Sequence, residues 1–84
     1  MPPTPAALCL AVADMYEISL DQMMDMDCIQ ARPARSDAWF RLRAEEEVDG
    51  RPRYTWARIA GWWGVERNVV SQSVYRRRAR LARA

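Results

Sequence analysis

The sequence predicts an all-α protein, and three observations carry this prediction. Apolar residues recur at helical spacing, and no segment shows the alternation of apolar and polar residues that is typical of a strand. Only three of the 84 residues are glycine, and half are apolar while 29% are charged, a balance typical of a small globular domain. A chain of this length buries roughly 60 to 65% of its unfolded surface. We therefore expect a single domain, residues 1–84, folded as a compact bundle of about five helices.

Two short helices are expected at the N-terminal end. The first begins after Thr4, with Pro5 at its first position, where the missing amide proton costs nothing, and it ends near Glu17. The second runs from 20 to about 26, because Ser19 and Gln22 have the spacing of a capping box. In that motif the serine side chain accepts an amide proton and the glutamine reaches back.

A third helix is expected over about 36–48. Pro33 interrupts the chain before it, and the Asp49-Gly50 pair ends it. Its partly apolar face carries Trp39, Phe40 and Leu42.

The last two predicted helices, over 56–63 and 67–82, have the spacing of a helix-turn-helix. Thr55 is the N-cap candidate of the first, and Gly64-Val65 makes a turn of the required length. The inner faces are marked by Ile59 and Ala60 and by Val70 and Val74. In such a motif the first helix supports the second, whose outer face is free to enter a DNA major groove.

Large side chains are expected to supply the core. Trp39, Trp56 and Phe40 should face inward. A helix cannot bury the adjacent Trp62 and Trp63 equally, and Trp63 is expected to be the buried one. Four methionines are expected to fill gaps, and two cysteines to be buried and reduced. These six residues are Met15, Met23, Met24, Met26, Cys9 and Cys28.

The residue inventory argues against an enzyme, a cofactor or a metal site. The chain has no histidine, its two cysteines lie 19 positions apart, and no glycine-rich phosphate loop or nucleophile-base pair is present. It also has no signal peptide and no apolar run of the roughly 18 to 20 residues that a membrane span requires. We expect a cytoplasmic, nucleoid-associated protein.

The net charge of +2 conceals a gradient along the chain. Residues 1–30 carry five carboxylates and no cation, residues 31–50 four arginines and five carboxylates, and residues 51–84 nine arginines and one glutamate. All thirteen cations are arginine, which suits bidentate contact with phosphate and guanine, although the codon usage of a GC-rich genome explains the same fact. The acidic first third is either a solvated face or a surface that meets a protein partner.

These segments, in order and spacing, resemble the C-terminal DNA-binding domain of the bacterial replication initiator DnaA over about residues 8–80. Residues 12–24 are similar to that domain's opening, and residues 32–35 resemble its basic loop. Thr55-Trp-Ala-Arg-Ile-Ala60 stands in place of the family's Ser-Leu-Pro-Glu-Ile-Gly, and Val65-Glu-Arg-Asn-Val-Val70 in place of its Gly-Arg-Asp-His-Thr-Thr-Val. The resemblance implies a binder of double-stranded DNA, as a monomer or part of a longer chain. No ATPase domain precedes this one, so an ATP-driven initiator is not expected.

The base-reading positions depart from the family. Its Asp-His-Thr triplet, which touches base edges, aligns with Glu66, Arg67 and Asn68 after a one-residue deletion. Arginine favours guanine and asparagine favours adenine, so we expect sequence-specific binding to a site other than the initiator's own. The face opposite Val70 and Val74 is expected to carry Arg67, Asn68, Ser71, Gln72 and Tyr75. Of these, Ser71 and Tyr75 are as well placed for phosphate, and a solvated polar face is the alternative.

Contacts to the DNA backbone are expected from a second set of residues. Thr55 would lie over a phosphate, because a helix N-terminus offers unpaired donors, and it also serves as a cap. Arginines near the end of the last helix complement its dipole in any protein. The set is Thr55, Tyr75, Arg53, Arg76, Arg77 and Arg78. The resemblance further implies that Arg32 or Arg35 enters the adjacent minor groove. Helix capping, or pairing with Asp37 or nearby glutamates, is the alternative.

Three functions remain open. The first is a transcription regulator, or the DNA-binding module of one, in a bacterial or phage-like genetic element. The second is a replication-associated factor that acts at an origin. The third is a protein-interaction module that has lost DNA binding. Roughly five to seven arginines on phosphate would give log affinity a slope of about −5 to −6 against log salt concentration.

Overall fold

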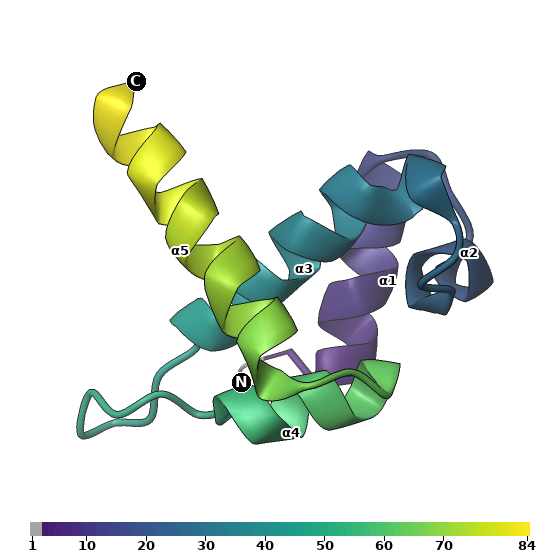
Figure 1. The fold of residues 1–84 in the computed structure, drawn as a ribbon. Helices are drawn as coiled ribbons and strands as arrows, with labels where there is room; N and C mark the ends of the chain where they lie inside the picture. Colours follow the sequence, from purple (N-terminus) through teal and green to yellow (C-terminus); the bar gives the residue numbers. More distant parts are fainter. Residues whose placement is uncertain (1–2) are drawn as a thin grey trace.

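Five α-helices make up the protein, whose residues 3–84 are described by a computed structural model (Figure 1). Within these residues, extended backbone pairs at one isolated antiparallel bridge, between Glu46 and Pro52. The all-α prediction is therefore confirmed. The elements are α1 (Pro5–Met15), α2 (Leu20–Met24), the 3-10 turn η1 (Ile29–Ala31), α3 (Arg32–Ala44), α4 (Trp56–Trp63) and α5 (Arg67–Arg83).

Local side chains set three of the helix starts, as expected. Oγ1 of Thr4 and Oγ1 of Thr55 each accept a hydrogen bond from the amide three residues later, at 3.1 Å. At α2, the Ser19 hydroxyl accepts the Gln22 amide proton at 3.0 Å, and Gln22 Oε1 accepts the Ser19 amide proton at 2.9 Å. These bonds satisfy amides that have no partner inside the helix. They explain why α1, α2 and α4 begin where the sequence predicts.

The start of α3 differs from the prediction. The helix begins at Arg32 rather than near Ser36. Pro33 does not interrupt the chain, because it lies in the first turn of the helix, where its missing N–H has no intrahelical partner to lose. The expected basic loop around Arg32 and Arg35 is instead the first turn of α3.

The end of α3 is also earlier than expected, at Ala44 rather than near Val48. Residues 45–47 are consecutive glutamates, which repel one another and the negative end of the helix dipole. The chain turns back instead, because the Arg53 amide donates to the Glu45 carbonyl at 2.8 Å. Gly50 supplies the positive φ of 86° that this turn requires. We call this segment the 45–53 turn.

One hydrophobic core lies among the helices. Trp63 belongs to it, as predicted: its indole N–H donates to the Met23 carbonyl at 3.1 Å, and its ring packs edge-on against Trp39 with a centroid distance of 5.7 Å. The neighbouring Trp62 is half-buried against Tyr54. The largest fully buried side chains are Met23, Leu42, Ile59, Val12, Val70 and Val74.

The core prediction is wrong for several residues. Met15 and Met26 are 58% and 36% exposed, because each lies at the end of a short helix or beyond it, where no other helix covers it. Cys9 is buried as expected, and burial raises the pKa of its thiol, which keeps it protonated and inert. Met24, Phe40 and Trp56 are partly buried and pack against the core, in agreement with the prediction, whereas Cys28 is half-buried rather than buried.

The last helix, α5, is attached to the body only by its first half. Val70 and Val74 are buried, whereas none of the residues from Tyr75 to Arg83 is. In Figure 1 the second half of α5 projects from the body and diverges from the N-terminal half of α3. A V-shaped space therefore opens between these two helices.

Candidate functional site

A short turn fixes α5 against α4. Gly64 ends α4 in the left-handed conformation, with φ of 66°, and the Val65 amide donates to the Ala60 carbonyl at 3.1 Å. Such a bond, spanning six residues, closes the end of a helix and redirects the chain at once. The buried Ile59 and Ala60 of α4 then share the core with Val70 and Val74 of α5.

The outer face of α5 carries Asn68 and Gln72. Successive residues of a helix are rotated by about 100°, which places both side chains on the side away from Val70 and Val74. Both are exposed, and no other element of residues 3–84 packs on them. Their amide groups are therefore presented to solvent from a helix whose opposite side is fixed in the core.

Two residues expected on that face lie elsewhere. Arg67 precedes Val74 by seven residues, which is close to two full turns, so it lies on the side of the buried valines and is exposed only because it is the first residue of α5. Ser71 follows Val70 directly, is half-buried, and donates its hydroxyl proton to the Asn68 carbonyl at 3.3 Å. Glu66, the residue before the helix, is exposed.

Tyr75 lies on one flank of the outer face. Its ring is 55% exposed and packs on Trp56 at a centroid distance of 5.7 Å, while the Arg43 guanidinium covers the Trp56 ring at 4.1 Å. Because Trp56 is the first residue of α4, this contact brings the N-terminus of α4, with its cap Thr55, beside the middle of α5. Thr55 is exposed.

Three of the predicted arginines are held by the fold itself. Arg35 is 3% exposed and donates to the carbonyls of Asp25 and Cys28, at 2.7 and 3.3 Å, and burial lowers the pKa of its guanidinium. Arg53 is half-buried and donates to the Glu46 carbonyl within the 45–53 turn. Arg77 pairs with Asp37. Of the two minor-groove candidates, only Arg32 is exposed.

Asp37 joins three helices through its carboxylate. It accepts hydrogen bonds from Tyr16, the residue that follows α1, at 2.7 Å and from Arg41 at 2.6 Å, and Arg77 of α5 lies at 3.4 Å. Burial disfavours the charged form, but these hydrogen bonds and the two arginine charges outweigh it and lower the pKa of Asp37. The hydrogen bond to Asp37 in turn raises the pKa of Tyr16. Asp37 is therefore a structural carboxylate that ties α5 to α1 and α3.

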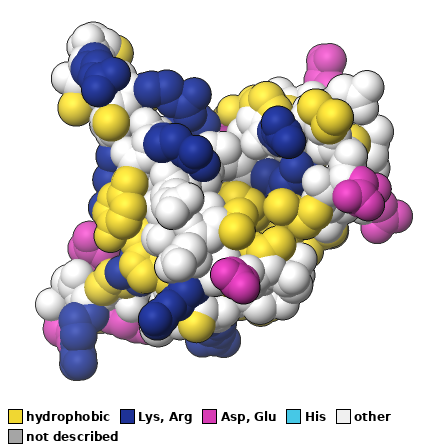
Figure 2. Space-filling view, viewed as in Figure 1, with side chains coloured by type: hydrophobic (Ala, Val, Ile, Leu, Met, Phe, Trp, Pro, Cys, Tyr) yellow, Lys and Arg dark blue, Asp and Glu magenta, His cyan; other side chains and the backbone are white. Residues whose placement is uncertain are grey.

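The other arginines around α5 are exposed and form no salt bridge within residues 3–84. Figure 2 shows dark blue groups along the projecting half of α5, whereas most magenta groups lie at the far edge of the molecule and around the 45–53 turn, with one more below the centre of the view. Among the arginines of α5, Arg77 alone is paired within residues 3–84. The exposed set is Arg32, Arg67, Arg76, Arg78, Arg80 and Arg83.

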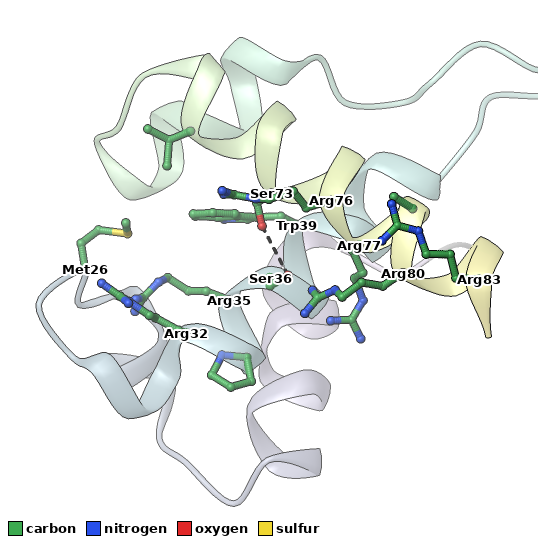
Figure 3. Close-up of a pocket in the computed structure, with 13 residues that line it drawn as sticks. Met26, Arg32, Arg35, Ser36, Trp39, Ser73, Arg76, Arg77, Arg80 and Arg83 are labelled. Atoms are coloured by element: carbon green, nitrogen blue, oxygen red, sulfur yellow. Dashed lines mark hydrogen bonds between the residues drawn. The ribbon is translucent and has the colours of Figure 1, made fainter.

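The V-shaped space between α5 and α3 forms a groove with a volume of about 870 Å³ (Figure 3). One wall is the stripe of α5 that recurs every three or four residues: Val69, Ser73, Arg76, Arg80 and Arg83. The other wall comes from Met26 and the first two turns of α3, including Arg32, Pro33 and Trp39. Ser73 and Ser36 bridge the two walls with a hydrogen bond of 3.3 Å between their hydroxyl groups.

The sequence placed Asn68 and Gln72 on the outer face of α5, misplaced Arg67 and Ser71, and missed the groove. Its α5 wall was visible as a helical stripe, whereas its α3 wall depends on the early start of that helix. The role of Asp37 had a partial signal, since Asp37 and Arg41 have the i, i+4 spacing of a helical ion pair. The contact between Asp37 and Arg77, which lie 40 residues apart, left no signal in the sequence.

Comparison with protein-family models, with curated proteins and with solved structures finds no match to this chain. None of the helices in residues 3–84 is long and apolar enough to cross a membrane. Over the same residues, no cluster of histidine, cysteine or carboxylate side chains could hold a metal ion.

Proposed function

We propose that this protein binds double-stranded DNA in a sequence-specific manner, with α4 and α5 acting as a helix-turn-helix, and that it regulates transcription in a bacterial or phage-like genetic element. One observation carries the proposal: α5 has an outer face with amide side chains that no other element covers, and exposed cations lie on either side of it. In a helix-turn-helix, that face is the one that enters the major groove.

The two flanks of α5 suit the two backbones that border a major groove. On one flank lies the N-terminus of α4, where Thr55 and the free amides after it offer donors to a phosphate. On the other lies Arg32, at the N-terminus of α3, together with Arg76 and Arg80. With the outer face of α5 in the DNA major groove, these groups would reach opposite DNA strands. Arg32 is the remaining candidate for a minor-groove contact.

Asn68 and Gln72 are the residues we propose for base reading. Each side-chain amide can donate to and accept from one adenine through N6 and N7. They lie four residues apart on α5, about one helical turn, so they would address neighbouring base pairs. Glu66 and Arg67 lie at the start of α5. There the Glu66 carboxylate could accept a hydrogen bond from cytosine, and the Arg67 guanidinium could bind guanine, at the outermost base pairs of the DNA site.

The DNA chemistry does not distinguish a regulator from a factor that acts at an origin. The resemblance to the DnaA domain supports the same mode of holding DNA, and the altered residues at 66–68 favour a different target sequence. A map of binding sites in the source genome separates the two, since a regulator occupies promoters and a replication factor occupies clustered sites at an origin.

Selection from a pool of duplexes with a randomised segment tests the proposal. The protein should enrich a single short motif after several rounds. Gln72→Ala should shift or blur the preference at one or two positions, while Arg51→Ala, an exposed substitution on the 45–53 turn, should leave the motif unchanged. Recovery of an unenriched pool, at a protein concentration that retains DNA, would reject sequence-specific binding.

A further inference from the structure

The apolar side chains in the two walls of the groove between α3 and α5, which we call its floor, are not explained by DNA binding. Val69 is 41% exposed and Met26 is 36% exposed, and both line the groove with Pro33, Trp39 and Ala79. A phosphodiester backbone is covered in charged oxygens and offers little apolar surface to such a floor. Figure 2 shows hydrophobic atoms in the space between the two helices, with dark blue groups beside them. The lining therefore suits a ligand that is partly apolar.

The shape of the groove suits an α-helix. Its two walls are helices that diverge from their contact at Ser36 and Ser73, so the space between them widens like the vacant position of a helical bundle. The α5 wall presents a stripe with i+3 and i+4 spacing along nearly the whole helix, which is the ridge that a neighbouring helix packs against. A volume of about 870 Å³ accommodates several side chains and is far larger than one ion needs.

The rim of the groove determines the charge of its occupant. Arg32 lies on one wall and Arg76, Arg80 and Arg83 on the other, all exposed and without a salt bridge within residues 3–84. No carboxylate lines the groove. Four unpaired cations around an apolar floor complement a helix that has an apolar stripe bordered by Glu and Asp.

We propose that this groove docks an acidic amphipathic helix of a partner protein. The apolar stripe of the partner covers Val69 and Met26, and its carboxylates pair with Arg32 and Arg80. Arg76 and Arg80 also lie beside the outer face of α5, so the partner and DNA compete for the second half of this helix. This last consequence rests on the proposed function, whereas docking itself does not.

Fluorescence anisotropy with a designed peptide tests the docking. The probe is a labelled peptide of about 17 residues, built from Glu, Ala and Leu, with the leucines at i, i+3, i+4 and i+7 so that they form one stripe. The reference is a peptide of identical composition whose leucines are distributed around the helix. We expect the striped peptide to bind at least about tenfold more tightly, which corresponds to about 1.4 kcal/mol. Equal affinity of the two peptides would show attraction by charge alone and would overturn the proposal, as would the absence of binding.

Two matched pairs of variants locate the site. Arg80→Glu should weaken binding of the striped peptide about tenfold, while Arg51→Glu, the same charge reversal on the 45–53 turn, should change it less than about twofold. Val69→Ser should weaken binding several-fold, while Val48→Ser, at a fully exposed position of the 45–53 turn, should have no effect. Binding that is insensitive to Arg80→Glu and Val69→Ser would place the peptide elsewhere and overturn the proposal.

A displacement titration then tests the competition. The unlabelled striped peptide should release a labelled duplex from the protein, and the reference peptide should not. If the duplex binds but the striped peptide does not, docking fails and the proposed function stands. If the striped peptide binds, with its dependence on Arg80, but no duplex does, docking stands and the proposed function fails.

Discussion

The two halves of α5 differ in what holds them. The first half, from Arg67 to Val74, is fixed by two valines buried in the core and by the turn from α4. The second half, from Tyr75 to Arg83, has no buried residue, and it contacts the body through the pairing of Arg77 with Asp37 and the packing of Tyr75 on Trp56. The first half carries amide side chains on its outer face, and the second carries most of the free arginines.

This difference fits two different tasks. Hydrogen bonds to base edges depend on the position and angle of each side chain, so the residues that make them need a helix that cannot shift. Attraction to phosphate depends mainly on the number of cations nearby and tolerates movement. Under the proposed function, the first half of α5 would read bases and the second half would bind phosphate non-specifically.

Removal of Asp37 should have the largest effect on this arrangement. Asp37→Ala deletes the carboxylate that three side chains share, and we expect the free energy of unfolding to fall by about 3 kcal/mol, measured by urea denaturation. Asp49→Ala, which removes the exposed partner of Arg51, is the control and should leave the unfolding midpoint unchanged. Equal effects of the two substitutions would show that Asp37 does not hold the helices together.

Truncation of the buried side chain in the first half should have the next largest effect. Val74 is 0% exposed, so Val74→Ala should lower the free energy of unfolding by about 2 kcal/mol through lost burial and a small cavity. Leu81 lies seven residues further along and is 55% exposed. Leu81→Ala should change stability by less than about 0.5 kcal/mol. Similar losses at the two positions would mean that the second half of α5 is packed on the body after all.

Substitutions in the two halves should affect DNA binding differently. Gln72→Ala should cost about 1.5 kcal/mol on the selected motif and little on a random duplex, because it removes the bidentate contact to a base that we propose. Arg80→Ala should weaken both duplexes alike and reduce the salt slope by about 1. Titrations of each variant against both duplexes measure this, and a uniform loss for Gln72→Ala would refute its role in reading.

A dependence on pH should be the smallest effect. The pKa of Asp37 is lowered in the folded protein, so its contribution is complete above the ordinary pKa, which is 3.8, and is lost as the pH falls from there through the folded value. Urea denaturation between pH 5 and 2 should therefore show a decline below about pH 4 that is smaller in Asp37→Asn. An identical decline in both proteins would assign the acid sensitivity to other carboxylates.

Local signals explain which parts of the fold were predictable. Thr4, Ser19 and Thr55 cap helices through contacts within three residues, and Gly64 ends one through its own backbone conformation. The two ends of α3 differ from the prediction for physical reasons. Pro33 is tolerated in the first turn of a helix, and the repulsion among residues 45–47 ends the helix early.

Local sequence signals could not predict which arginines are free and which are held by the fold. Arg76 and Arg77 are neighbours in sequence, yet one is exposed and the other is paired with Asp37. Arg32 and Arg35 lie one turn apart on α3, yet only Arg35 is buried under the carbonyls of Asp25 and Cys28. Which arginine is free depends on how distant segments pack, and this determined both the candidate interface and the groove beside it.

The salt dependence of DNA binding tests the central claim most directly. Arg35, Arg53 and Arg77 are held by the fold, and Arg67 lies at the proposed base-reading end of α5. The five other exposed arginines around α5 would contact phosphate, which predicts a slope of log affinity against log salt concentration of about −4.5. The measurement is the affinity for a random duplex at several salt concentrations. A slope near that value, reduced by about one in Arg80→Ala, agrees with our account. A flat response would contradict it.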